Sequence, residues 1–223
     1  MNRKDLSSIT AIVFDFDGTL TIGGEDIKRE AWKPIVKPWK DEILLAKANA
    51  EEKFRHGKGS RHDILRETFK LSNFAEDEIV QMADAYAAAY DALVQKMLRQ
   101  GGMPEGTEGF LKDIHRMFDL YVNSATPKDA LCVSVRSLGI ARYFRAVLGM
   151  PKSKIENLQM IVQKGGLRPK DILFVGDGLG DLKAAKEFGC NFVGIPKSWN
   201  LWKKGKTDFP LIDIVTELPK LLS

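Results

Sequence analysis

Two aspartates in the motif Asp15-Phe16-Asp17-Gly18-Thr19-Leu20 give the strongest chemical signal in this sequence of 223 residues. The motif ends an apolar run that begins at Ala11, and such a run is typical of a buried strand that leads into a loop. Ligands of open α/β sheets bind at the carboxyl ends of the strands, which is where this motif would lie. We therefore expect both carboxylates to belong to a functional site.

Three later segments add polar groups at predicted strand ends or helix starts. They are Asn123-Ser124-Ala125-Thr126, Gly176-Asp177-Gly178-Leu179-Gly180-Asp181, and the pair Lys152 and Lys154. A cluster of carboxylates needs a cation, and hard oxygen ligands suit Mg²⁺. A hydroxyl and an ammonium beside that cation supply the donors and positive charge that a phosphoryl group requires. The four segments together therefore predict a magnesium-dependent phosphoryl site.

Short apolar runs alternate with helical patterns near the N-terminus and again from residue 105 onward. We expect strands at 11–15, 120–124, 172–176 and 191–195, with a weaker candidate at 146–148. Helical spacing of apolar residues predicts helices around 110–117, 130–135 and 155–162. Strands that are apolar throughout and separated by helices are typical of a parallel sheet covered on both faces. The fold class is therefore predicted as α/β, with a doubly wound, Rossmann-like parallel sheet.

The segment 22–104 breaks this alternation and carries no convincing strand. Helical patterns occupy 25–37, 41–54, 60–69 and 77–99, and Ser60 suits the N-cap of the third helix. Glycine pairs at 23–24 and 101–102 bracket the segment and suit a hinge. We expect a helical cap domain, 22–104, inserted into an α/β catalytic core formed by 1–21 and 105–223.

Composition excludes several classes of protein. Hydrophobic residues make up 44% and charged residues 29%, as in a soluble globule, and no apolar run reaches the length of about 18 residues that a membrane span needs. The net charge is only +4, and the basic run 203–206 is expected to be a solvated loop rather than a nucleic-acid contact. Residues 1–6 lack the apolar core of a signal peptide, and Cys132 and Cys190 are interpreted as small buried hydrophobes. We expect a cytoplasmic protein.

A few further residues are interpreted as structural. The three histidines, His56, His62 and His115, lack metal-ligand spacing, and His115 is interpreted as a residue on the surface of a helix. Trp199 and Trp202 are expected to pack late in the chain against the core rather than to form a stacking site. The role of the tail 197–223 stays open at this point.

By these motifs and their order, the chain resembles the haloacid dehalogenase superfamily of phosphohydrolases, in particular its phosphoglycolate phosphatase and β-phosphoglucomutase branch. The resemblance covers nearly the whole chain and is weaker in the cap and after about residue 197. It implies that Asp15 is the nucleophile, which would become an aspartyl phosphate. It also implies that Asp17 is the general acid and base.

The resemblance further implies which residues hold the metal. Asp15, Asp177 and Asp181 would bind Mg²⁺, with Asp177 the preferred direct ligand of the latter two, and Asp17 would contribute its backbone carbonyl. These ligands come from two of the four motifs. The cofactor implied is therefore Mg²⁺ alone.

The phosphate-binding groups follow from the same resemblance. Ser124 and Ala125 at the end of the second motif would contact phosphoryl oxygens, together with Lys154. The run Lys154-Ile155-Glu156-Asn157-Leu158 looks like the lysine of the family followed at once by its helix. Lys152 stays as the alternative lysine.

The cap carries candidates for substrate selection. The run 55–62 resembles the cap loop that selects substrate in this branch, so Lys58 and Arg61 are candidates to meet a polar or anionic part of the substrate. A solvated, flexible loop is the alternative interpretation. The segment 29–33 resembles the first cap helix, but 25–28 lacks the histidine that the sugar phosphomutases place there.

The resemblance predicts an enzyme, a magnesium-dependent phosphoric monoester hydrolase. Its substrate would be a small phosphorylated metabolite of the sugar phosphate or phosphoglycolate type, with neither nucleic acid nor membrane as a partner. A phosphomutase of the β-phosphoglucomutase type and a non-catalytic binder of phosphorylated metabolites are the alternatives. Both a monomer and a homodimer are compatible with the sequence.

Overall fold

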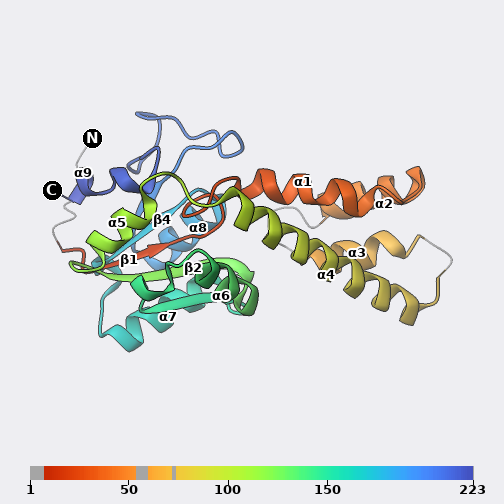
Figure 1. The fold of residues 1–223 in the computed structure, drawn as a ribbon, viewed down its shortest axis with the longest axis horizontal. Helices are drawn as coiled ribbons and strands as arrows, with labels where there is room; N and C mark the ends of the chain where they lie inside the picture. The colour runs from red at the N-terminus through yellow and green to blue at the C-terminus, as the bar shows by residue number, and fades with distance from the viewer. Residues whose placement is uncertain (1–7, 54–59, 72–73, 223) are drawn as a thin grey trace. The chain divides into compact units, whose positions relative to one another are not determined.

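The computed structural model describes residues 8–53, 60–71 and 74–222. The chain divides into two compact units, one formed by residues 1–25 and 98–223, and the other by residues 26–97. The first unit contains the sheet, whereas the described residues of the second contain helices and no strand (Figure 1). The sequence places the cap boundaries a few residues further out, at 22 and 104, and the assignment of this segment as a cap stays a prediction.

A five-stranded sheet forms the centre of the first unit. Its strands are β1 (Ala11–Phe14), β2 (Asp119–Pro127), β3 (Ala146–Met150), β4 (Ile172–Gly176) and β5 (Asn191–Gly194). All neighbours are parallel, and the strand order is β3-β2-β1-β4-β5. The five predicted strands are confirmed, including the weaker candidate that became β3. Because β1 lies between β2 and β4, the carboxyl ends of three motif-bearing strands are adjacent.

Helices cover both faces of this sheet. They are α5 (Thr107–Ile114), α6 (Lys128–Ser137), α7 (Lys154–Gly165), α8 (Leu179–Phe188) and α9 (Pro219–Leu222), with short 3-10 turns at Ala141–Tyr143, Pro169–Asp171 and Val215–Glu217. Alternate residues of β1 enter different cores: Ile12 and Phe14 pack with α5 and α6, whereas Ala11 and Val13 pack with α7 and α8. Side chains of a strand alternate between faces, so this division shows a sheet buried on both sides. The doubly wound α/β class is therefore confirmed.

The end of α5 differs from the prediction. The helix stops at Ile114, so Met117 lies outside it and is 68% exposed. His115, expected on a helix surface, is the C-cap residue of α5 and is half-buried, with its ring centroid 5.1 Å from that of Tyr143. The chain must turn here to enter β2, and the turn directs the imidazole against the neighbouring ring. Cys190 is buried, but Cys132 is only half-buried, so the expectation of burial holds for Cys190 alone.

The described residues of the second unit form four helices, of which the first and last extend beyond the limits of the unit. They are α1 (Gly24–Val36), α2 (Asp41–Lys53), α3 (Arg61–Phe69) and α4 (Glu76–Gly101). Ser60 is the N-cap of α3, as predicted, and forms a capping box with Asp63. The unit has its own apolar core around Leu65, Phe69 and Ala83. No helix in the described part of the chain is long and apolar enough to cross a lipid bilayer.

Glycines allow a close approach of the chain near the predicted hinge. Gly24 has a φ of 39°, and a β-carbon at this position would lie 2.9 Å from the Cα atom of Gly18. Gly102 has a φ of 67°, and its carbonyl accepts a hydrogen bond of 3.1 Å from the amide of Ile22. A side chain at Gly24 would therefore displace the loop that follows β1. The hinge itself stays a prediction.

The segment after β5 belongs to the first unit. Leu211 forms a bridge with Gly194, and three later residues, Ile212, Val215 and Leu218, lie in the same core as β1. The Trp202 ring packs at 5.2 Å from Phe209, which confirms that this tryptophan is a packing residue. The basic run 203–206 is exposed, as expected for a solvated loop.

Candidate active site at the carboxyl ends of the strands

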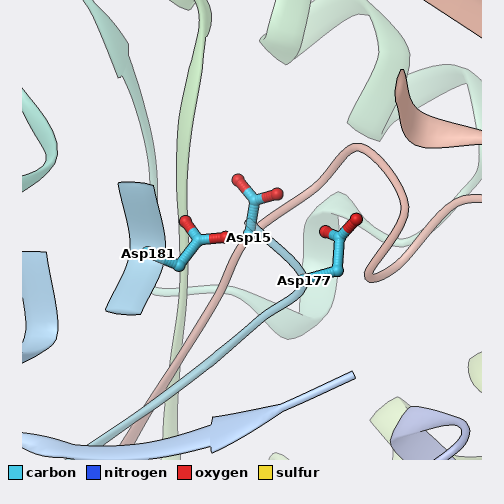
Figure 2. Close-up of side chains that lie close together, drawn as sticks. All are labelled: Asp15, Asp177 and Asp181. Carbon is cyan, nitrogen blue, oxygen red and sulfur yellow. The ribbon is translucent and has the colours of Figure 1, made fainter. Parts of the chain in front are cut away.

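Three buried carboxylates meet where β1 and β4 end. Asp15 follows β1, Asp177 follows β4, and Asp181 lies in the first turn of α8. One carboxylate oxygen from each lies within 4.8 Å of the others (Figure 2). Each of these residues is at most 6% exposed. Three hard oxygen donors at this spacing fit Mg²⁺ better than the softer metals that thiolates or imidazoles select.

Two glycines make this convergence possible. Gly18 has a φ of 85°, and a β-carbon there would lie 2.5 Å from Oδ2 of Asp177. A β-carbon at Gly176 would lie 2.5 Å from Cγ of Asp181. Both glycines therefore leave room that the carboxylates occupy, and a side chain at either position would displace an acid of the cluster.

Lys154 supplies positive charge to the cluster. It is the first residue of α7, and its Nζ lies 2.6 Å from Oδ1 of Asp15 and also contacts Oδ1 of Asp181. Burial by itself lowers the pKa of Lys154, but the charges of the two carboxylates raise it above its usual value, so the ammonium stays protonated. Lys152, the alternative in the sequence, is exposed.

The electrostatics of Asp15 indicate an excess of negative charge. Burial raises the pKa of Asp15 well above its usual value, and the charges of Asp181, Asp177 and Asp17 add to the rise, while Lys154 lowers it. One ammonium therefore does not balance the carboxylates that surround Asp15. A divalent cation held by the same oxygens would restore the balance.

Asp181 has a second, structural bond. Its Oδ2 accepts a hydrogen bond of 2.8 Å from the amide of Gly178, which forms a capping arrangement at the start of α8. This helix cap is compatible with a role as metal ligand, because one oxygen of Asp181 caps the helix and the other contacts Lys154. The cap fixes the rotamer and so helps to place the carboxylate.

Asp17 lies beside Thr126 rather than within the three-carboxylate group. The hydroxyl of Thr126 donates a hydrogen bond of 2.9 Å to Oδ2 of Asp17, and both residues are buried. From the sequence, this threonine is either a plain loop residue or one that supports the residues of the site, and the contact with Asp17 fits the second interpretation. Its position two residues after Ser124 is the one signal that could have pointed to the contact.

Ser124 and Ala125 lie at the end of β2. Ser124 is 2% exposed, and its Oγ accepts a hydrogen bond of 3.1 Å from the amide of Thr126, whereas Ala125 is exposed. The strands β1 and β2 are paired with Phe14 opposite Val122, so Asp15 and Ser124 both follow the last pairing. The predicted phosphate-binding hydroxyl is therefore held at the same edge of the sheet as the predicted nucleophile.

Of the two candidates for substrate contacts in the predicted cap, the structure describes only Arg61. Lys58 lies outside the described residues. Arg61 is the first residue of α3, forms an ion pair with Asp91, and has its guanidinium carbon 5.3 Å from the ring centroid of Tyr90. Its guanidinium therefore has partners within the helical unit, and a role in substrate binding stays a prediction.

Sequence reasoning missed several polar residues that support the site. Thr19 donates a hydrogen bond of 3.0 Å to Oδ1 of Asp177, although it lies within the first motif. Asn123, which is fully buried, donates from Nδ2 to the carbonyl of Lys154 at 2.9 Å and accepts at Oδ1 from Asn157 at 3.0 Å. This amide pair joins the end of β2 to the first turn of α7. It therefore fixes the backbone position from which the side chain of Lys154 extends.

Comparisons with known proteins agree with this geometry. A family model described as haloacid dehalogenase-like hydrolase matches residues 9–189. A phosphoglycolate phosphatase of Yersinia pseudotuberculosis is 25% identical over 91% of this chain and 88% of its own length. A predicted phosphoglycolate phosphatase structure from Haemophilus somnus has a TM-score of 0.71 at 22% identity, covering 97% of this chain and 99% of its own. A β-phosphoglucomutase structure from Clostridium difficile has a TM-score of 0.65 at 22% identity, covering 94% and 93%.

Proposed function

The chain belongs to the haloacid dehalogenase-like hydrolases, as a phosphatase of that family, and we propose that it hydrolyses a small phosphorylated metabolite through an aspartyl phosphate on Asp15. One observation carries this proposal: Asp15 is buried at the carboxyl end of the central strand, in contact with Lys154 and beside two further carboxylates. A buried nucleophilic carboxylate with an ammonium within hydrogen-bond reach is what an in-line attack on phosphorus requires.

In the first half-reaction an oxygen of Asp15 attacks phosphorus, and the bond from phosphorus to the leaving oxygen breaks. Asp17 donates a proton to that oxygen, and Thr126 orients the Asp17 carboxyl through its hydrogen bond at 2.9 Å. Lys154, Ser124 and the backbone amide of Ala125 would hold the phosphoryl oxygens. The alcohol product then departs.

In the second half-reaction water attacks the phosphorus of the aspartyl phosphate. Asp17 accepts a proton from that water, the bond between phosphorus and the Asp15 oxygen breaks, and inorganic phosphate forms. Mg²⁺, when bound by Asp15, Asp177 and Asp181 and by the carbonyl of Asp17, supplies positive charge that offsets the charge of the transferring group. The chain thus returns to its starting state with both acids regenerated.

The helical segment 22–104 is proposed as a cap that selects the substrate. Relatives named phosphoglycolate phosphatase that align over 91% of the chain support a phosphoglycolate-type substrate, and a sugar phosphate is the other candidate. Lys58 and Arg61 are the proposed cap contacts. Closure over the core would exclude water while the aspartyl phosphate forms.

Release of inorganic phosphate from a panel of compounds tests the proposal. The panel holds phosphoglycolate, sugar phosphates and nucleotides, each assayed with Mg²⁺, with EDTA, and with Asp15→Asn protein. We expect metal-dependent release from a few compounds and no release by the variant. A phosphomutase would instead need a bisphosphate activator and would convert substrate without releasing phosphate. A non-catalytic binder would show ligand affinity but no turnover.

A further inference from the structure

Asn200 lies in the loop after β5 and uses every hydrogen-bonding position of its amide. It is 7% exposed. Its Nδ2 donates to the carbonyl of Asp177 at 2.8 Å and to that of Ile195 at 2.9 Å. Its Oδ1 accepts from the amides of Lys197 at 3.1 Å and of Trp202 at 3.0 Å. A carboxamide has two donor hydrogens and two acceptor lone pairs, so all four are engaged.

The loop around Asn200 is held in a conformation that it would not adopt by local preference. Leu201 has a φ of 57°, and the left-handed region costs an L-residue about 1–2 kcal/mol. Its side chain is 79% exposed, so packing of that side chain does not account for the conformation. The bond from the amide of Trp202 to Asn200 closes an Asx-type turn across Leu201. The residue that ends this turn, Trp202, is held by packing of its ring, whose centroid lies 5.8 Å from that of Phe192 and 5.2 Å from that of Phe209.

This loop is joined to the loop that carries Asp177. The amide of Ile195 donates to the carbonyl of Gly176 at 2.9 Å, and the Asn200 amide donates to the next carbonyl, that of Asp177. On the other side, Thr19 donates to the carboxylate of Asp177. Asp177 is therefore held at its backbone by the tail and at its side chain by the first motif.

We propose that Asn200 is a positioning residue for the metal site. By fixing the carbonyl of Asp177, it fixes where the carboxylate stands relative to Asp15 and Asp181. The inference rests on the proposed function, because it takes these three carboxylates as ligands of Mg²⁺. It assigns a role to the tail beyond residue 197, which would hold a metal ligand without touching the metal. Residues that orient ligands in this way change metal affinity by about 10–100-fold when they are lost.

Metal binding by the full-length, metal-free protein tests the inference without reference to activity. Calorimetric titration with Mn²⁺ as the probe is done for wild type, Asn200→Asp and Asn200→Ala. Asn200→Asp keeps the shape and the two accepted bonds but removes both donors that hold the carbonyls. We expect the Kd for Mn²⁺ to rise about tenfold or more in both variants. Saturating Mg²⁺ should then restore most of kcat, because the ligands themselves remain.

Asn191 provides a matched control. Its Nδ2 also donates to two backbone carbonyls, those of Lys170 at 2.9 Å and Ile172 at 3.4 Å, but at the start of β5, the end of the strand opposite to the site. Asn191→Ala should lower the melting temperature as a lost hydrogen bond does, yet leave the Kd for Mn²⁺ within about twofold of wild type. A purely structural asparagine at position 200 would behave in the same way.

The outcomes separate this inference from the proposed function. A Kd that stays at the wild-type value in the folded Asn200 variants, or that rises equally in Asn191→Ala, overturns the positioning role alone. Wild-type protein that binds no Mn²⁺, or binds it equally well after Asp181→Asn, overturns the metal site and this inference with it. If Asn200→Asp does not fold by circular dichroism, Asn200→Ala decides, since it adds no buried charge.

Discussion

Replacing Lys154 by methionine tests the charge arrangement of the site without altering its size. The ammonium contacts Asp15 and Asp181 while its side chain is only 16% exposed, and the two acids are 9% and 1% exposed. Methionine fills a similar volume but leaves both carboxylates without this partner. At such burial, water screens the charges of the two carboxylates little.

The expected loss of stability in the absence of metal is large. Removing one partner of a buried ion pair costs about 3–5 kcal/mol. In a protein of this size each kcal/mol shifts the melting temperature by about 2–4 °C, so even the lower bound gives about 6–12 °C. A bound divalent cation would replace the missing charge in the variant, where no ammonium competes for the same oxygens. It should therefore bind the variant more tightly than wild type and stabilise it more, by about 1.4 kcal/mol for each tenfold difference in Kd. We therefore expect millimolar Mg²⁺ to close much of the gap between variant and wild type.

Thermal unfolding followed by circular dichroism, in EDTA and then in Mg²⁺, measures both effects. Lys152→Met is the matched control, because this neighbouring lysine is exposed, and its loss should change stability by less than about 0.5 kcal/mol. The reasoning is refuted if Lys154→Met melts with Lys152→Met in EDTA. It is refuted equally if the deficit of Lys154→Met is the same with and without Mg²⁺.

Three further predictions concern stability and the metal site. Ser60→Ala removes the capping box of α3 and should cost about 1 kcal/mol in urea unfolding at pH 7. The hydrogen bonds of Ser60 lower the pKa of Asp63 in the folded state. The stabilisation that they give is therefore present above the unfolded pKa of about 4 and is lost as the pH falls through the lower folded pKa. The cost of Ser60→Ala should accordingly be smaller at pH 3 than at pH 7. Thr107→Val should leave the melting temperature unchanged or raise it, because its buried hydroxyl has no hydrogen-bond partner within the described residues, whereas Thr21→Val, which removes a bond of 3.1 Å to a carbonyl, should cost about 1 kcal/mol. Gly18→Ala should weaken Mn²⁺ binding in calorimetry by about tenfold or more, since the added β-carbon would lie 2.5 Å from a carboxylate oxygen of the cluster.

The layers of the fold were predictable from local pattern. Buried parallel strands are apolar on both faces. The run from Ala11 to Phe14 could therefore be predicted as a strand although its apolar and polar residues do not alternate. The strand order was not accessible in this way, because the pattern of a strand carries no record of its neighbours. The early end of α5, which leaves Met117 outside the helix, has a similar origin, since it depends on where β2 must begin.

Residues of the candidate site differ in how far the sequence indicates them. Asp15, Asp177 and Asp181 are carboxylates at strand ends, and the order of their motifs predicted that they would meet. Thr126 near the end of β2 and Asn200 in the loop after β5 are ordinary polar residues, and such residues most often bond to nearby backbone or to water. Only tertiary contact distinguishes them, because each acts through a partner far away in the sequence.

The central position of β1 has a consequence for synthesis of the chain. Ala11 pairs with Asp119 on one side and with Ile172 on the other, so the earliest strand to leave the ribosome has no sheet partner until most of the chain has been made. Contacts of such high sequence separation form slowly, and an unpaired apolar strand is open to association with other chains meanwhile. The helices of residues 26–97 contact one another across shorter sequence separations, as between Trp32 and Tyr90, and emerge before either partner of β1. The strand that leads into the predicted nucleophile is thus the strand of this sheet that stays unpaired longest during translation, and a chaperone that shields apolar segments would have its target there.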